Sequence, residues 1–81
     1  MHCFRIDAIL DPQSLPRIAG FFAQRGMIPS AMRMRTLRRH MRIEVTVKGL
    51  TAPQAAMTAA RLGEMFAVIN VEPKARAGIP G

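Results

Sequence analysis

The chain has 81 residues, which is enough for one small domain and too few for two. Hydrophobic residues make up 49% of it and charged residues 21%, a composition that excludes an intrinsically disordered protein. Twelve Lys and Arg against five Asp and Glu give a formal net charge of +7, which attracts acidic partners or nucleic acid. Because so small a domain has a thin core, we expect it to self-associate.

The N-terminal residues and the cysteine content indicate the compartment. The single cysteine, Cys3, cannot form an internal disulfide, although small secreted domains usually depend on several. Charges at Arg5 and Asp7 interrupt the stretch where a secretory leader needs apolar residues. The longest uncharged run, residues 49–60, is too short to span a bilayer. We therefore expect a cytoplasmic protein with no leader and no membrane-spanning segment.

Residues 3–10 alternate with a period of two, which predicts a half-buried β-strand. The side chains expected on its core side are Phe4, Ile6, Ala8 and Leu10. A turn follows at residues 11–14, because Pro12 cannot donate to a sheet and Asp11 and Ser14 favour turns. Ser14 is the predicted N-cap of a helix that ends at Gly26. The helix face expected to pack on the sheet contains Leu15, Ile18, Ala19 and Phe22.

Alternation returns at Ile28 and again at Met41, which predicts two strands joined by a bend at residues 37–40. Met32 and Met34 belong to an apolar face of the first of these strands. An arginine cluster falls on the same hairpin: Arg33, Arg35, Arg38, Arg39 and Arg42. Three interpretations stay open for this arginine cluster: a solvated surface, a docking surface for a protein partner, or a contact with nucleic acid.

Thr51 and Gln54 have the spacing of a capping box, which predicts a second helix that reaches about Met65. Residues 66–71 are rich in β-branched side chains and predict a last strand, opened by Phe66 and closed by Pro73. The order βαββαβ is that of the α+β ferredoxin-like sandwich, a four-stranded antiparallel sheet with two helices on one face. We place the domain at residues 3–72 and a flexible C-terminal tail at residues 73–81.

The reactive side chains exclude several functions of this fold. One cysteine cannot hold an iron–sulfur cluster or form the paired-cysteine site of a metal chaperone, and we expect no bound metal. Neither His2 nor His40 has a partner at catalytic spacing, so we expect no independent enzyme. RNA-binding relatives of the fold stack bases on aromatic side chains of the central strands, and we expect none there. A nucleic-acid-binding module acting through the arginine cluster remains an alternative function.

The turn before the first helix allows a binding function. A helix N-terminus offers unpaired N–H groups that favour a carboxylate, such as that of an amino acid. The alternative is that Asp11 and Ser14 only cap the helix.

Residues 10–18 (LDPQSLPRI) and 20–26 (GFFAQRG) resemble the first turn and helix of ACT domains, in particular those of the short small subunits of acetolactate synthase (acetohydroxyacid synthase). In those subunits an acidic residue or Asn is followed by Pro, two polar residues, Leu, any residue and Arg, and the apolar helix ends in Arg-Gly. The resemblance covers about residues 4–72.

This resemblance implies a homodimer that forms side by side through the second strand, with an eight-stranded sheet. It also implies a regulatory subunit that binds and activates the catalytic subunit of branched-chain amino-acid synthesis. Thiamine diphosphate, Mg and FAD would belong to that catalytic subunit, and this chain would hold no cofactor. An effector such as valine would bind at the dimer interface. The residues carried over are Asp11, Gln13, Ser14 and Leu15 of one chain and Met27 and Ile28 of the other.

Two positions depart from many effector-binding relatives. The turn contains no glycine, and Ile28 stands where an asparagine is common. An isoleucine side chain cannot form a hydrogen bond with an amino acid. The resemblance also makes the arginine cluster a candidate docking surface for the catalytic subunit. A free-standing ACT domain that senses an amino acid and regulates another protein is the alternative function within the same family.

Overall fold

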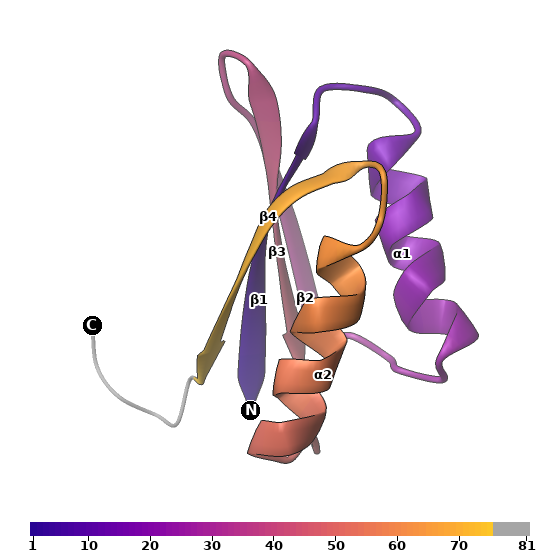
Figure 1. Cartoon of the computed structure of the whole chain (residues 1–81), viewed down its shortest axis with the longest axis vertical. Helices are drawn as coiled ribbons and strands as arrows, with labels where there is room; N and C mark the ends of the chain where they lie inside the picture. The colour runs from indigo at the N-terminus through magenta and orange to yellow at the C-terminus, as the bar shows by residue number, and fades with distance from the viewer. Residues whose placement is uncertain (76–81) are drawn as a thin grey trace.

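The computed structural model describes the backbone of residues 1–75 and the side chains of residues 1–72. Its elements are β1 (His2–Ile9), α1 (Ser14–Gln24), β2 (Ala31–Thr36), β3 (His40–Val47), α2 (Ala52–Gly63) and β4 (Val68–Ala75). The strands form one antiparallel sheet in the order β2-β3-β1-β4, and both helices lie on the same side of it (Figure 1). This architecture confirms the α+β ferredoxin-like sandwich. No helix of the described residues is long and apolar enough to cross a membrane.

The core lies between the helices and the two central strands, β1 and β3. Alternate residues of each strand point toward the helices and are buried, as the period-two pattern predicts. The buried side chains of these strands on this side are Phe4, Ile6, Ala8, Met41, Ile43, Val45 and Val47. From α1, Ile18 and Phe22 are fully buried against this layer, and the rings of Phe4 and Phe22 have centroids 6.0 Å apart.

The start of α1 differs from the prediction. Ser14 is not the N-cap: the cap position is Gln13, which makes no side-chain cap hydrogen bond. Instead the Asp11 Oδ1 atom accepts a hydrogen bond of 2.7 Å from the Gln13 N–H. The hydroxyl of Ser14 is buried and donates to the carbonyl oxygen of Ile9 at 2.8 Å. Ser14 therefore ties the helix to the end of β1, because a buried hydroxyl needs a partner and the Ile9 carbonyl oxygen, which also accepts from the Asp11 N–H at 2.9 Å, has a second lone pair for it.

The second helix begins as predicted. Thr51 Oγ1 accepts from the Gln54 N–H at 3.2 Å, and Gln54 Oε1 accepts from the Thr51 N–H at 2.9 Å, which completes the capping box. The helix ends at Gly63, slightly before the expected Met65.

The boundaries of the outer segments also need correction. Phe66 does not open β4 but lies in the preceding turn, with 88% of its surface exposed. β4 continues through Pro73 to Ala75, so residues 73–75 of the tail expected at 73–81 belong to the strand, and residues 76–81 lie outside the described part of the chain. An edge strand tolerates proline because its outer side needs no ladder donor. Leu10, expected in the core, follows the end of β1 and is largely exposed.

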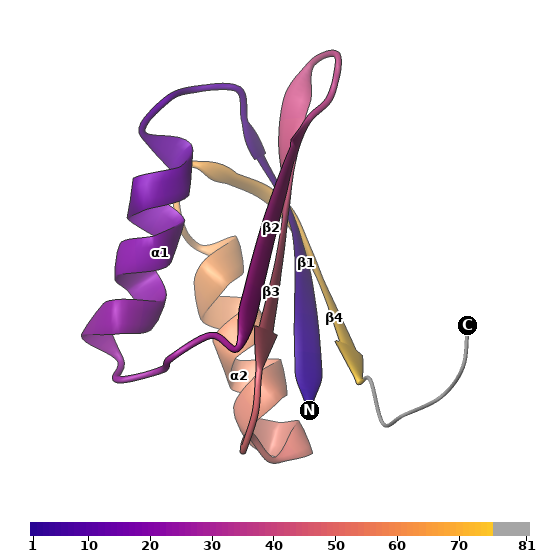
Figure 2. The same ribbon diagram turned by 180° about the vertical axis from the view of Figure 1, so that it is seen from behind.

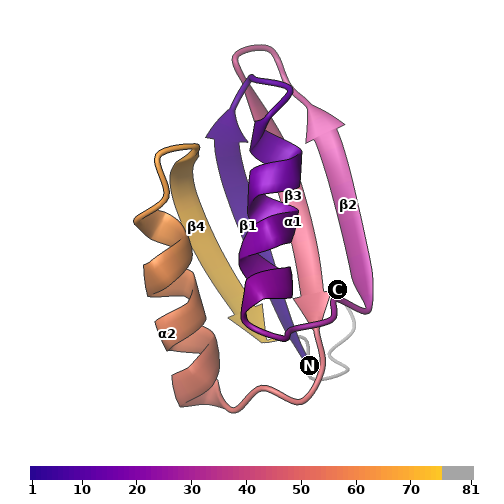
Figure 3. The ribbon, with the colours of Figure 1, turned by 90° about the vertical axis from the view of Figure 1, so that its right-hand side faces the viewer.

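β2 is an edge strand, and all six of its residues are exposed. Its register sets Met32 opposite Val45 and Met34 opposite Ile43, on the side of the sheet that carries the helices. Neither methionine is covered: α1 lies over β1 and β3 and leaves β2 bare (Figure 3). Figure 2, which views the sheet from the β2 edge, shows no described element beyond β2. The apolar face predicted for this strand is therefore present, and no described residue of the chain covers it.

Candidate functional site

The sheet face turned away from the helices, here called the open face, carries most of the charged side chains of the strands. The register sets Arg5 opposite Glu44 and Glu72, and Asp7 opposite Arg42. Because successive strand residues point to opposite faces, these groups alternate with the core residues of the same strands. The open face thus consists of the polar strand residues that alternate with the hydrophobic core residues.

Two ion-pair groups neutralise the centre of the open face. Arg5 Nε lies 3.6 Å from Glu44 Oε2, and Arg5 Nη1 lies 3.4 Å from Glu72 Oε1. Arg42 Nε donates to Asp7 Oδ1 at 3.1 Å, and His40 Nε2 lies 3.3 Å from the same oxygen. The participating side chains are only partly exposed, from 18% for Asp7 to 51% for Glu72. None of these carboxylates is left free for acid–base chemistry, which suits a binding surface.

The arginine cluster extends from this centre to the edge at β2. Arg33 and Arg35 project from β2 on the open face, and Arg42 projects from β3 directly opposite Arg35. Arg38 and Arg39 occupy the turn between β2 and β3. The structure therefore gathers all five predicted docking residues on one hairpin. Of the five, Arg42 alone has a carboxylate within 4.0 Å among the described residues.

Close packing of like charges marks this region as unusual. Like charges directly opposite one another destabilise a sheet, and Arg35 faces Arg42 across the β2–β3 ladder. A surface hollow of about 450 Å³ lies here, lined by Arg33, Met34, Arg35, Arg42 and Glu44. Its chemistry suits carboxylates or phosphates, because guanidinium groups bind both through paired hydrogen bonds.

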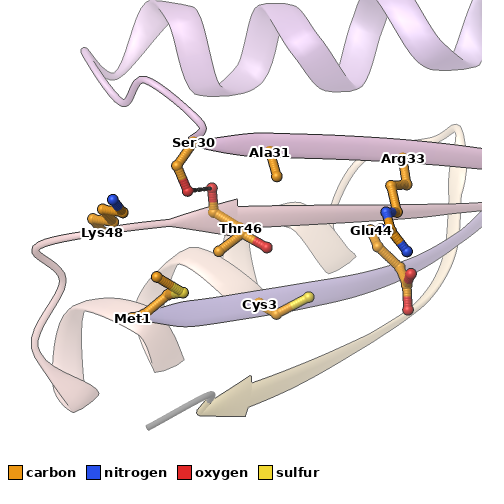
Figure 4. A pocket seen from close by; sticks show the side chains of 8 residues that line it. All are labelled: Met1, Cys3, Ser30, Ala31, Arg33, Glu44, Thr46 and Lys48. Atoms are coloured by element: carbon orange, nitrogen blue, oxygen red, sulfur yellow. Dashed lines mark hydrogen bonds between the residues drawn. The ribbon is translucent and has the colours of Figure 1, made fainter. Parts of the chain in front are cut away.

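A second hollow, of about 380 Å³, lies at the other end of the β2–β3 pair (Figure 4). Its lining comes from the chain terminus and three strands: Met1, Cys3, Ser30, Ala31, Arg33, Glu44, Thr46 and Lys48. Cys3 is a free thiol with only 5% of its surface exposed. Both the N–H and the hydroxyl of Ser30 donate to the Thr46 carbonyl oxygen, at 2.8 and 3.3 Å. The sequence analysis did not single out Ser30, Thr46 or Lys48, because only strand register brings them together.

The expected effector residues separate into two groups within one chain. Asp11, Gln13 and Ser14 line a small hollow of about 120 Å³ at the β1–α1 turn, whereas Leu15 is half-buried against the core. Met27 and Ile28 follow the opposite end of α1, whose 11 residues span about 16 Å at 1.5 Å per residue. Met27 packs against the core, and Ile28 is 86% exposed. Ile28 can therefore lie beside a β1–α1 turn only if that turn belongs to a second copy of the chain.

The hollow at the β1–α1 turn also contains residues that the sequence analysis missed. Arg17 and the exposed Phe66 line it together with Ile9 and Ala67. The turn that contains Phe66 is held there because the Ile9 N–H donates to the Ala67 carbonyl oxygen at 2.9 Å. The spacing of Arg17, one helical turn beyond Gln13, is a signal that could have identified it.

The described residues contain no group of three or more His, Cys, Asp or Glu side chains placed to hold a metal ion.

Comparison with known families agrees with this architecture. The profile of the ACT-like domain matches residues 1–77. The chain belongs to the ACT-like domain family. ACT domains are regulatory, non-catalytic modules of the amino-acid-binding class. No curated protein sequence matches this ACT-like domain significantly.

Solved structures show the same fold at low sequence identity. The crystal structure of the ACT domain from GTP pyrophosphokinase of Chlorobium tepidum has a TM-score of 0.76 at 11% identity, covering 90% of this chain and 95% of that one. The solution structure of that domain has a TM-score of 0.80 at 11% identity, covering 93% and 85%. The C-terminal domain of MgtC from Mycobacterium tuberculosis has a TM-score of 0.66 at 12% identity, covering 90% and 83%.

Proposed function

We propose that this ACT-like domain is the regulatory small subunit of acetolactate synthase, which binds and activates the thiamine-diphosphate-dependent catalytic subunit in branched-chain amino-acid biosynthesis. The observation that carries the proposal is the resemblance of residues 10–26 to that subunit class. In the structure these residues form the β1–α1 turn and most of α1. The chain itself holds no cofactor in this proposal, and the free thiol of Cys3 supports a reducing cytoplasm.

The active form in this proposal is a homodimer paired through β2. The support is the bare edge of β2 and the exposure of Met32 and Met34, at 38% and 44%. An unpaired strand edge is a ready template for another strand, and two copies that pair through it continue one sheet. In that dimer the helices of both copies lie on one side and the open faces on the other.

The dimer in this proposal has little capacity to bind valine. Asp11 already accepts the hydrogen bond of the Gln13 N–H, so this donor at the start of α1 is not available to an effector carboxylate. Ile28 offers no hydrogen bond from the second chain. We therefore expect activation of the catalytic subunit that is insensitive to valine.

The arginine cluster is the docking surface for the catalytic subunit in this proposal. Four of its five arginines have no carboxylate within 4.0 Å among the described residues, which supports a partner with an acidic surface, since complementary charge raises the association rate and fixes orientation. Charge reversal at Arg33 and Arg35 should then abolish association. The matched control reverses Arg25 and Arg61, which lie on the helical side of the molecule.

The test is acetolactate formation by the cognate catalytic subunit, with and without the purified chain, and with valine as a further condition. We expect the chain to raise the rate, the R33E/R35E variant to lose this effect, and the R25E/R61E variant to keep it. An unchanged rate with the wild-type chain contradicts the proposal. In that case a free-standing amino-acid sensor becomes the better candidate, and calorimetric titration with branched-chain amino acids tests it.

A further inference from the structure

Two guanidinium groups flank the bare edge of the sheet. Arg33 and Arg35 are exposed on the open face of β2, and neither has a carboxylate within 4.0 Å among the described residues. Glu44, which lies opposite Arg33, is paired with Arg5 on its other side. Arg33 and Arg35 therefore form no ion pair with the described residues of their own chain. Their role therefore lies in what the β2 edge and the open face meet.

Backbone alternation decides which groups of β2 face outward. The Leu37 N–H donates to the His40 carbonyl oxygen at 2.8 Å across the hairpin turn. Because hydrogen-bonded positions alternate along an antiparallel pair, the odd-numbered positions of β2 bond to β3. Met32, Met34 and Thr36 therefore present their N–H and C=O groups at the outer edge. When two copies pair antiparallel through this edge, the even-numbered residues of one copy form backbone hydrogen bonds with even-numbered residues of the other. The odd-numbered residues, which include Arg33 and Arg35, then lie opposite odd-numbered residues.

This parity restricts the dimer of the proposed function to few registers. With β2 spanning Ala31–Thr36, two registers pair most of the strand. One sets Arg33 opposite Arg33 of the second copy, and the other sets Arg33 opposite Arg35 of the second copy. Such cross-strand neighbours lie about 4.5–5.5 Å apart at Cα. Four guanidinium groups therefore meet on the open face beside the two-fold axis, and like charges on an edge are a known means of preventing strand pairing.

We propose that pairing of two copies through β2 is strengthened by an acidic, extended segment of the protein partner, bound over Arg33, Arg35 and Arg42. This inference rests on the proposed function for two points, the identity of the partner and the homodimer paired through β2. The bound segment supplies the negative charge that the described chain does not place there. Homodimer formation and partner binding are then coupled, and by linkage each strengthens the other by the same factor.

The geometry favours an extended acidic segment. Alternate residues of a strand repeat every 6.6–6.8 Å or so, and acidic side chains at alternate positions of an extended segment have the same repeat. The hollow of about 450 Å³ lined by Arg33, Arg35 and Arg42 receives the carboxylates, and guanidinium groups bind carboxylates in a bidentate manner.

The same face disfavours nucleic acid. Asp7, Glu44 and Glu72 stand on the open face beside the arginines and repel phosphate groups. The open-face positions of the two central strands in the described chain carry no Phe, Tyr or Trp for base stacking, and the imidazole of His40 lies 3.3 Å from Asp7 Oδ1.

The test measures the dimer dissociation constant of the full chain by sedimentation equilibrium, with helicity monitored by circular dichroism. Each protein is measured at low and high KCl, with an acetylated peptide of alternating Glu and Thr, and with oligothymidylate. The variants are R33Q/R35Q and the matched control R25Q/R61Q, which removes two charges from the helical side. For the wild type and the control, we expect the peptide or high salt to tighten the dimer about tenfold. R33Q/R35Q should dimerise tightly without either addition.

Three outcomes overturn the inference. In the first, neither salt nor the peptide changes the dissociation constant of the wild-type dimer, and R33Q/R35Q has the same constant. This result shows that the arginine charges do not control dimer formation, while the homodimer itself is retained. Monomers under all conditions, including for R33Q/R35Q, contradict the β2 homodimer of the proposed function itself. Tightening by oligothymidylate and not by the peptide assigns the arginines to nucleic acid.

Discussion

The hydroxyl of Ser14 donates a hydrogen bond of 2.8 Å to the carbonyl oxygen of Ile9 and so joins the first turn of α1 to the end of β1. Ser14 is buried, with 1% of its surface exposed, so its hydroxyl depends on this contact for a hydrogen bond. The β1–α1 turn, where effector binding is expected in this family, is thereby held in one conformation. Its rigidity follows from one buried polar contact rather than from a helix cap.

The Ser14→Ala substitution should lower the free energy of unfolding by about 1 kcal/mol, because it removes the hydrogen bond between the buried hydroxyl and the Ile9 carbonyl oxygen, which keeps only the Asp11 N–H at 2.9 Å. Urea denaturation measures this change. Ser30→Ala is the control, since the hydroxyl of Ser30 is exposed and its bond to Thr46 is longer, at 3.3 Å. An equal loss in both variants would show that the Ile9 contact has no special role.

The Phe22→Leu substitution should lower the free energy of unfolding by about 1–2 kcal/mol, because Phe22 is fully buried and the smaller side chain leaves a cavity beside Phe4. Phe66→Leu makes the same chemical change at an exposed position and should alter stability by less than about 0.5 kcal/mol. Thermal and urea denaturation of the pair test the core assignment. A larger loss for Phe66 would contradict the position of the α2–β4 turn.

The ion pair between Asp7 and Arg42 should show energetic coupling of about 0.5–1 kcal/mol in a double-mutant cycle of Asp7→Asn and Arg42→Gln. The coupling is modest because both side chains are partly exposed, and it should decrease at high salt. Arg35 and Asp7 give the comparison cycle, since no ion pair joins them in the structure. Zero coupling for the first pair would show that the open face is not held by this contact.

The Ile28→Asn substitution should introduce valine binding if the β1–α1 turn and residue 28 of two copies share an effector site. Ile28 is 86% exposed, so the change should leave the fold intact. Calorimetric titration of the wild type and the variant with valine measures the change in valine affinity. The control is Leu10→Asn, which introduces an asparagine at another exposed position. Valine binding by the wild type would contradict this account of the site. So would the absence of valine binding from both the wild type and the Ile28→Asn variant.

Much of the fold could be predicted from the sequence, because the relevant forces act between near neighbours. The alternation of residues 41–47 determined a strand with one buried face, and the Thr51–Gln54 spacing determined the capping box, since both depend on side chains within a few positions. The order of elements then specified the ferredoxin-like sandwich, and the residues of the β1–α1 turn indicated the ACT family.

Contacts between distant residues were decided only by the tertiary structure. Asp7 and Arg42 are 35 positions apart, and only the register of β1 with β3 pairs them. Ser14 looked like a helix cap because its local preference does not reveal that Ile9 is within reach. Met32 and Met34 were predicted to share an apolar strand face, but α1 lies over β1 and β3 and leaves that face of β2 exposed. The spacing of residues in the sequence predicts which face of a strand a side chain occupies. Strand register and the width of the helical layer determine which other residues that side chain contacts.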